Sequence, residues 1–195
     1  SEMCIRDRLD DKPANVIDAA AAGASAGLQL ALNVGAMLLA FIGLIAMING
    51  IFSGVGGWFG YPQLSLELLL GWLFSPLAFL IGVPWSEAVV AGSFIGQKLV
   101  VNEFVAYLNF APYLKDEVLI NGVAMSEHTK AIISFALCGF ANLSSVAILL
   151  GGLGSMAPNR RGTIAKFGLK AVLAGSLSNL MSATIAGFFL ALSGM

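Results

Sequence analysis

The chain has 195 residues, of which 58% are hydrophobic and only 11% are charged, and its mean hydropathy is +0.88. Soluble domains carry about 25% charged residues, so this composition is that of an integral membrane protein. The formal net charge of -1, without a basic stripe, excludes nucleic acid as a partner. The two cysteines, Cys4 in a polar segment and Cys138 in an apolar run, indicate neither a disulfide nor a metal site.

Long runs without charge predict the helices. Four such runs lack Asp, Glu, Lys and Arg altogether: 19–66, 68–86, 131–159 and 171–195. A spanning helix needs about 20 apolar residues, so the first run predicts one long helix over 24–51, ended by a glycine-rich stretch. The segment 64–81 contains Glu67 and is compatible with a spanning helix or, preferably, an interfacial one. Spanning helices are predicted at 130–153 and 164–192.

The basic residues predict the orientation and a hairpin. Four of them cluster at the connection between the last two predicted helices and in the first turns of the second, at Arg160, Arg161, Lys166 and Lys170. The positive-inside rule puts this connection in the cytoplasm. Segment 82–110 must then begin and end outside, and it is too short for two spans. It therefore predicts a re-entrant helical hairpin whose turn, near 98–103, is its most polar part. The alternative is a pair of interfacial helices with Lys98 and Glu103 in water.

A second polar group lies in the predicted helix 130–153. Ser134, Cys138, Asn142 and Ser145 follow one another at steps of four, four and three, which predicts one polar stripe with Asn142 near the bilayer midplane. Gly139 lowers helix propensity there, so an interruption could free backbone groups for a solute or ion. The alternative is that these side chains only join helices. Asn179 in the last helix is interpreted as a packing residue.

Four motifs resemble one known family. The sequences GVPWSE at 82–87, GQK at 96–98 and NEFVAY at 102–107 are similar to the second hairpin of the concentrative nucleoside transporters. The sequence ALCGFAN at 136–142, with Ser145, resembles the helix that follows that hairpin. The resemblance extends from about residue 15 through the last helix and covers the C-terminal half of the family.

The resemblance implies a function and a site. Family members take up nucleosides across the cytoplasmic membrane by symport with Na⁺ or H⁺, and they form homotrimers in which a transport domain moves against a scaffold. By similarity, Glu103, Asn142 and Ser145 would bind the ribose hydroxyls, and Phe140 would pack against the nucleoside. The expected partners are thus a nucleoside, the lipid bilayer and further copies of the chain, with a coupling ion but no cofactor or metal centre.

The resulting organisation has five parts. They are a polar head (1–14), a scaffold helix and its connection (15–62), an interfacial or spanning helix (63–81), a re-entrant hairpin with an outer loop (82–129), and two spanning helices joined by a cytoplasmic basic connection (130–195). The fold class is all-α, one half of an inverted-repeat transporter. The first eight residues have no recognised counterpart, which leaves open whether they are native. The family's base-reading hairpin and ion site would lie upstream, so the chain is interpreted as a fragment.

Two other function classes remain at this point. A secondary transporter or channel for another small polar solute would use the same hairpin and polar helix. An intramembrane enzyme could use Glu103 as a base, but the sequence offers no metal cluster and no nucleophile paired with a base, so the chain is predicted not to be an enzyme.

Overall fold

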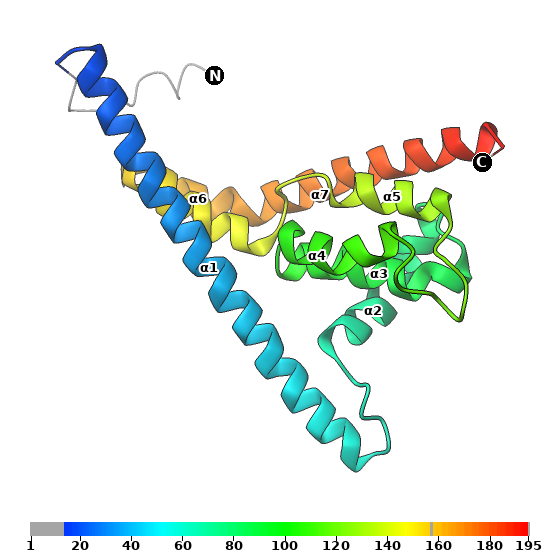
Figure 1. The fold of residues 1–195 in the computed structure, drawn as a ribbon. Helices are drawn as coiled ribbons and strands as arrows, with labels where there is room; N and C mark the ends of the chain where they lie inside the picture. Colours follow the sequence, from blue (N-terminus) through cyan, green and yellow to red (C-terminus); the bar gives the residue numbers. More distant parts are fainter. Residues whose placement is uncertain (1–13, 157, 195) are drawn as a thin grey trace.

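The computed structural model describes residues 14–156 and 158–194, so nearly all of the predicted polar head lies outside the described residues (Figure 1). The described residues form helices and no β-strand, which confirms the predicted all-α class. The helices are α1 (Val16–Trp58), α2 (Leu66–Leu80), α3 (Trp85–Val100), α4 (Glu103–Leu114), α5 (Glu127–Leu137), α6 (Leu143–Met156) and α7 (Arg161–Leu192), with a 3₁₀ turn, η1 (Pro158–Arg160), before α7.

Helix α1 is longer than the predicted 24–51. It begins at the N-cap Asn15, whose side chain accepts a hydrogen bond from the Asp18 amide at 2.9 Å. The glycine-rich stretch predicted to end it is helical to Trp58, and the chain turns only at Gly60, where φ is +80°. A helix of 43 residues is about 65 Å long, roughly twice the hydrocarbon thickness. Its apolar side chains stay exposed, Leu39 by 75%, so this surface requires lipid or another protein surface.

Helix α2 joins α1 to the hairpin. The Glu67 carboxylate accepts two hydrogen bonds from Asn49 of α1, at 2.9 and 3.1 Å. Helices α2 and α3 meet at a bend of 115° and pack closely. A Cβ atom at Gly71 would lie 2.6 Å from the Val89 carbonyl oxygen, and one at Gly92 would lie 2.7 Å from the Ser75 amide. Only glycine allows the two backbones to approach this closely, which fixes α2 against the hairpin.

Helices α3 and α4 form a helical hairpin over the predicted segment. Two residues, Val101 and Asn102, connect them. The hairpin is held by Phe94 and Phe110, whose ring centroids are 5.2 Å apart, and its buried side chains join those of α2 and α5 in one core. Hydrophobic burial thus orients the turn, and with it the polar residues that the turn carries.

The predicted helix 130–153 is broken in the structure. Helix α5 ends at Leu137 and α6 begins at Leu143, and α7 runs beside both of them (Figure 1). The spacing of Ser134, Cys138 and Asn142 had predicted one continuous polar stripe. The break interrupts the helix between Cys138 and Asn142, so this prediction is wrong. Glycine at 139 was the one local signal of the interruption.

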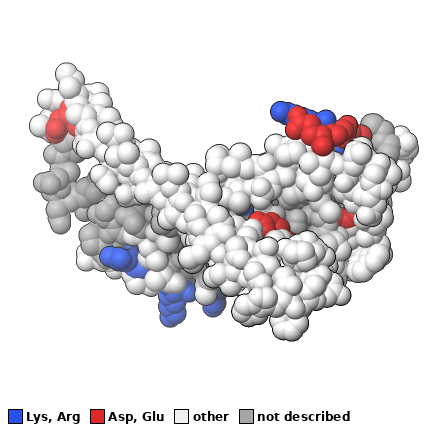
Figure 2. All heavy atoms as spheres, turned by 60° about the horizontal axis from the view of Figure 1, so that its bottom comes forward, with Lys and Arg blue, Asp and Glu red and all other residues white. Residues whose placement is uncertain are grey.

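The charges and long apolar helices agree with a membrane protein. Among the described residues two helices, α1 and α7, are long and apolar enough to cross a bilayer, or up to three spans form if the bent pair α2 and α3 counts as one. Figure 2 shows acidic and basic side chains together at one edge, basic side chains on the other side, and a largely uncharged surface between. Lys130 at the start of α5 pairs with Asp116 and Glu127 at 2.7 Å each.

Candidate functional site

The break between α5 and α6 is the centre of the site, because it frees backbone carbonyl groups inside the molecule. The last four carbonyl oxygens of an α-helix have no partner within the helix. Here the hairpin supplies two partners. The Tyr107 hydroxyl donates to the Ser134 carbonyl oxygen at 2.8 Å, and Lys98 Nζ donates to the Ala136 carbonyl oxygen at 2.9 Å.

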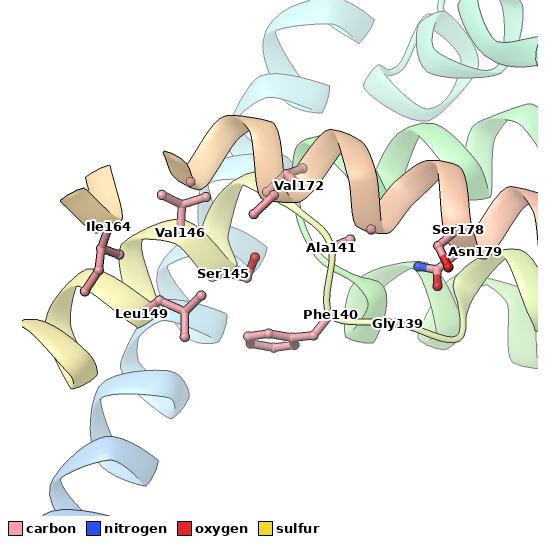
Figure 3. Close-up of a pocket in the computed structure, with 13 residues that line it drawn as sticks. Gly139, Phe140, Ala141, Ser145, Val146, Leu149, Ile164, Val172, Ser178 and Asn179 are labelled. Carbon is pink, nitrogen blue, oxygen red and sulfur yellow. The ribbon is translucent and has the colours of Figure 1, made fainter. Parts of the chain in front are cut away.

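Helix α7 supplies a third partner. With its amide oriented to satisfy both neighbours, Asn179 donates from Nδ2 to the Cys138 carbonyl oxygen at 3.2 Å and accepts at Oδ1 from Lys98 Nζ at 2.6 Å. In Figure 3 the Asn179 side chain lies toward the break beside Gly139. A Cβ atom at Gly139 would collide with this amide, so only glycine at position 139 leaves room for the Asn179 side chain. Three separate elements therefore meet at the end of α5.

Asn142 begins the second half-helix. Its Oδ1 accepts from the Ser145 amide at 2.7 Å and from the Ser144 hydroxyl at 2.8 Å, which makes it the N-cap of α6. Its Nδ2 donates to Glu103 Oε2 at 2.5 Å. Asn142 is fully buried, so the side chain links the half-helix to the hairpin in an environment without bulk water.

Glu103 occupies the first turn of α4. The preceding Asn102 caps the helix by accepting from the Val105 amide at 2.9 Å. A carboxylate at a helix N-terminus is stabilised by the helix dipole. Glu103 Oε1, unlike Oε2, accepts no hydrogen bond within the described chain, and it is not sealed from the surface. One carboxylate oxygen is thus left for a ligand.

Lys98 is buried, 2% exposed, at the end of α3. This excludes the alternative in which two interfacial helices hold Lys98 in water. In the described part of the chain it forms no direct ion pair, but the Glu103 carboxylate is close enough to interact with it electrostatically. The sequence assigned Lys98 no role, although it is an ionisable residue in an apolar run and belongs to the GQK motif. Asn179 was interpreted as a packing residue, and no local signal pointed to its contact with the break.

A cavity of about 340 Å³ adjoins the break (Figure 3). Two of the predicted site residues line it, Phe140 and Ser145, while Glu103 and Asn142 do not. Phe140 is 52% exposed, and Ser145 is buried with its hydroxyl donating to the Asn142 carbonyl oxygen at 2.6 Å. Most of the remaining lining is apolar. The structure therefore joins Glu103, Asn142 and Ser145 in one chain of contacts and leaves Phe140 beside it, free to contact a ligand.

The polar side chains at the break can exchange hydrogen bonds with a hydroxylated solute. Within the described residues no group of three or more His, Cys, Asp or Glu side chains could hold a metal ion. A carboxylate accepts hydrogen bonds and a side-chain amide both donates and accepts, so vicinal hydroxyl groups are well matched to Glu103 and Asn142.

Comparison with known proteins finds one family in the family model and in the named relatives. Residues 2–187 match the family model described as the C-terminus of Na⁺ dependent nucleoside transporters. An uncharacterized transporter from Haemophilus influenzae is 63% identical over 187 residues, covering 95% of this chain and 44% of that protein. The nucleoside permease NupC from Helicobacter pylori is 58% identical over 183 residues, covering 94% and 43%.

A solved structure is also similar. The structure of CNTnw in an inward-facing substrate-bound state superposes with a TM-score of 0.82 at 66% identity, covering 96% of this chain and 45% of that one. The chain thus spans less than half the length of these relatives.

Proposed function

The chain belongs to the family of Na⁺ dependent nucleoside transporters, as its motifs predicted, and we propose that it provides the ribose-binding half of a nucleoside symporter. The observation that carries this proposal is the contact between Glu103 of the hairpin and Asn142 at the helix break. Two polar residues from segments 39 positions apart meet there in apolar surroundings, and ionisable groups inside membrane segments are retained mainly for function.

The chemistry of ribose fits this pair. Glu103 Oε1 is free to accept a hydroxyl hydrogen, and hydrogen bonds to a charged acceptor are about twice as strong as neutral ones. Asn142 can donate to a second hydroxyl oxygen if its bond to Oε2 is shared with the ligand. The hydroxyl of the buried Ser145 donates to the Asn142 carbonyl oxygen at 2.6 Å and helps to hold Asn142 in place. A solute without vicinal hydroxyls would leave these polar groups unpaired and would bind weakly.

Phe140 would supply the apolar contact. Its ring is half exposed at the cavity and can pack against the nucleoside. The polar pair and the aromatic ring would then hold the sugar and an adjoining face of the substrate.

Coupling and assembly complete the proposal. Transport would be driven by Na⁺ or H⁺ across the cytoplasmic membrane, with the ion bound by residues outside this chain. The exposed apolar surface of α1 supports assembly with further copies of the chain, because a helix of that length needs cover beyond the bilayer core; the assembly we propose is a homotrimer. The chain would act in binding and transport, without catalysis.

Uptake of radiolabelled uridine tests the proposal. The measurement uses a chimera in which this chain replaces the aligned segment of CNTnw, expressed in bacteria that lack their own nucleoside uptake. Glu103→Gln keeps the side-chain size but removes the charge, and uptake should fall at least about tenfold. Unchanged uptake with normal membrane expression would contradict the role of Glu103. If unlabelled ribose or uracil inhibits the uptake and unlabelled uridine does not, the chain belongs to a transporter for another polar solute.

A further inference from the structure

The hydrogen bonds of Lys98 join the hairpin to the end of α5 and to α7. Its ammonium donates to the Ala136 carbonyl oxygen at 2.9 Å and to Asn179 Oδ1 at 2.6 Å, while Asn179 donates to the Cys138 carbonyl oxygen at 3.2 Å. Lys98 and Asn179 together therefore replace hydrogen bonds that a continuous helix would have formed at Ala136 and Cys138. The break can exist inside the protein because these two side chains satisfy it.

The charge of Lys98 suits this position. The C-terminal end of a helix carries a partial negative charge, so an ammonium group at the end of α5 is stabilised there. The same ammonium lies within electrostatic reach of Glu103. A partly buried carboxylate is stabilised by a nearby positive charge, so Lys98 also offsets the charge of Glu103.

The geometry connects these bonds to the site. Phe140 and Asn142 lie on the five residues between α5 and α6, directly after the carbonyl groups that Lys98 and Asn179 bind. Glu103 lies on the same hairpin as Lys98. A displacement of the α5 end relative to the hairpin would therefore change the distance between Glu103 and Asn142.

We propose that Lys98 is a positioning residue for the ribose site: through Ala136 and Asn179 it holds the helix break at the hairpin turn and so fixes Asn142 against Glu103. The inference rests on the proposed function. It assigns Lys98 no contact with the nucleoside itself.

The test compares two ligands in the CNTnw chimera. Affinity is measured for uridine and for 2′,3′-dideoxyuridine, which lacks both ribose hydroxyls, by competition against radiolabelled uridine. In Lys98→Met the uridine affinity should fall at least about tenfold, because charge-assisted bonds are lost, while that of the dideoxy analogue should change less than about threefold. Lys166→Met removes an exposed lysine of α7 and should leave both affinities unchanged.

A second variant protects the test against misfolding. Asn179→Leu removes the amide that bridges Lys98 and Cys138, and it should lower uridine affinity selectively in the same way. The double variant Lys98→Met with Asn179→Leu should lose less than the sum of the single losses, because both changes break one network. If Lys98→Met does not fold, the selectivity of Asn179→Leu alone decides the question.

The outcomes separate the two proposals. If the unmodified chimera binds uridine no better than the dideoxy analogue, the ribose role fails and the inference fails with it. If the unmodified chimera discriminates and Lys98→Met retains that discrimination, only the inference fails. Equal losses for both ligands would show a general structural effect and would also overturn it.

Discussion

Replacement of Asn142 by serine or alanine separates the two contacts of this residue. Its Oδ1 caps α6 by accepting from the Ser145 amide at 2.7 Å, and its Nδ2 binds Glu103 Oε2 at 2.5 Å. Serine is as good an N-cap as asparagine but is too short to reach Glu103. Alanine can make neither contact. The two variants therefore differ in the cap alone.

The expected magnitudes follow from these contacts. Loss of an N-cap costs about 0.5–2 kcal/mol, so Asn142→Ala should be less stable than Asn142→Ser by that amount. Both variants also lose the amide that contacts Glu103 and that, as proposed, donates to a ribose hydroxyl; at the strength of a hydrogen bond in a charged site, the lost ligand contact is worth about 1.5–3 kcal/mol. At about 1.4 kcal/mol for each factor of ten, uridine affinity should fall roughly 10- to 150-fold in both.

The assay pairs thermal unfolding with uridine binding in the CNTnw chimera. Asn142→Ser should unfold at a higher temperature than Asn142→Ala, while the two have similar, weakened affinity. Ser182→Ala, an exposed site on α7 whose hydroxyl bonds only the local Ser178 carbonyl oxygen, should change neither quantity. If Asn142→Ser binds uridine like the unmodified protein, the Glu103 contact does not position Asn142. If the serine and alanine variants unfold together, Asn142 is not a significant cap.

Three further predictions concern packing, the aromatic contact and the outer loop. Gly92→Ala should lower the unfolding temperature, since its Cβ would lie 2.7–2.8 Å from backbone atoms of α2. Overpacking costs about 1–3 kcal/mol, whereas the gain in helix propensity is about 1 kcal/mol. In the control Gly162→Ala the added Cβ meets open space, so the unfolding temperature should not fall. Phe140→Ala should weaken uridine binding about fivefold with an unchanged unfolding temperature, because the ring is 52% exposed; a lowered temperature would show a packing role. Glu87→Gln should speed hydrogen exchange at the start of α5, since Glu87 accepts hydrogen bonds from the Ser126 amide and hydroxyl at 2.9 and 2.8 Å. Uridine uptake should stay normal. Unchanged hydrogen exchange would mean that this contact is dispensable.

The sequence predicted the parts of the fold that depend on local hydrophobicity. Uninterrupted apolar runs indicated α1 and α7, and polar residues in an otherwise apolar segment indicated the hairpin. The contact between Glu103 and Asn142 could also be anticipated, because each is a rare polar residue in its run and both belong to recognisable motifs. The roles of these residues in binding remain predictions.

The helix break could not be derived from local sequence. The run 131–159 contains no charged residue, and its first 20 residues are compatible with one helix, with Gly139 as the one weak signal of an interruption there. The groups that stabilise the break, Lys98 and Asn179, lie about 40 residues to either side of it in sequence. A local pattern therefore underestimates how readily the chain leaves the helix when distant side chains bind its free carbonyl oxygens.

The same network explains why so few polar groups remain for a solute. Tyr107, Lys98 and Asn179 are occupied by backbone oxygens at the end of α5, and Asn142 and Ser145 bind each other at the start of α6. No buried side-chain nitrogen or oxygen in the described residues lacks a partner. Glu103 Oε1 differs from these groups, because it is accessible and accepts no hydrogen bond in the described chain. An arrangement that satisfies every buried polar group yet leaves one charged oxygen open is suited to a ligand that donates a hydrogen bond, as a ribose hydroxyl does.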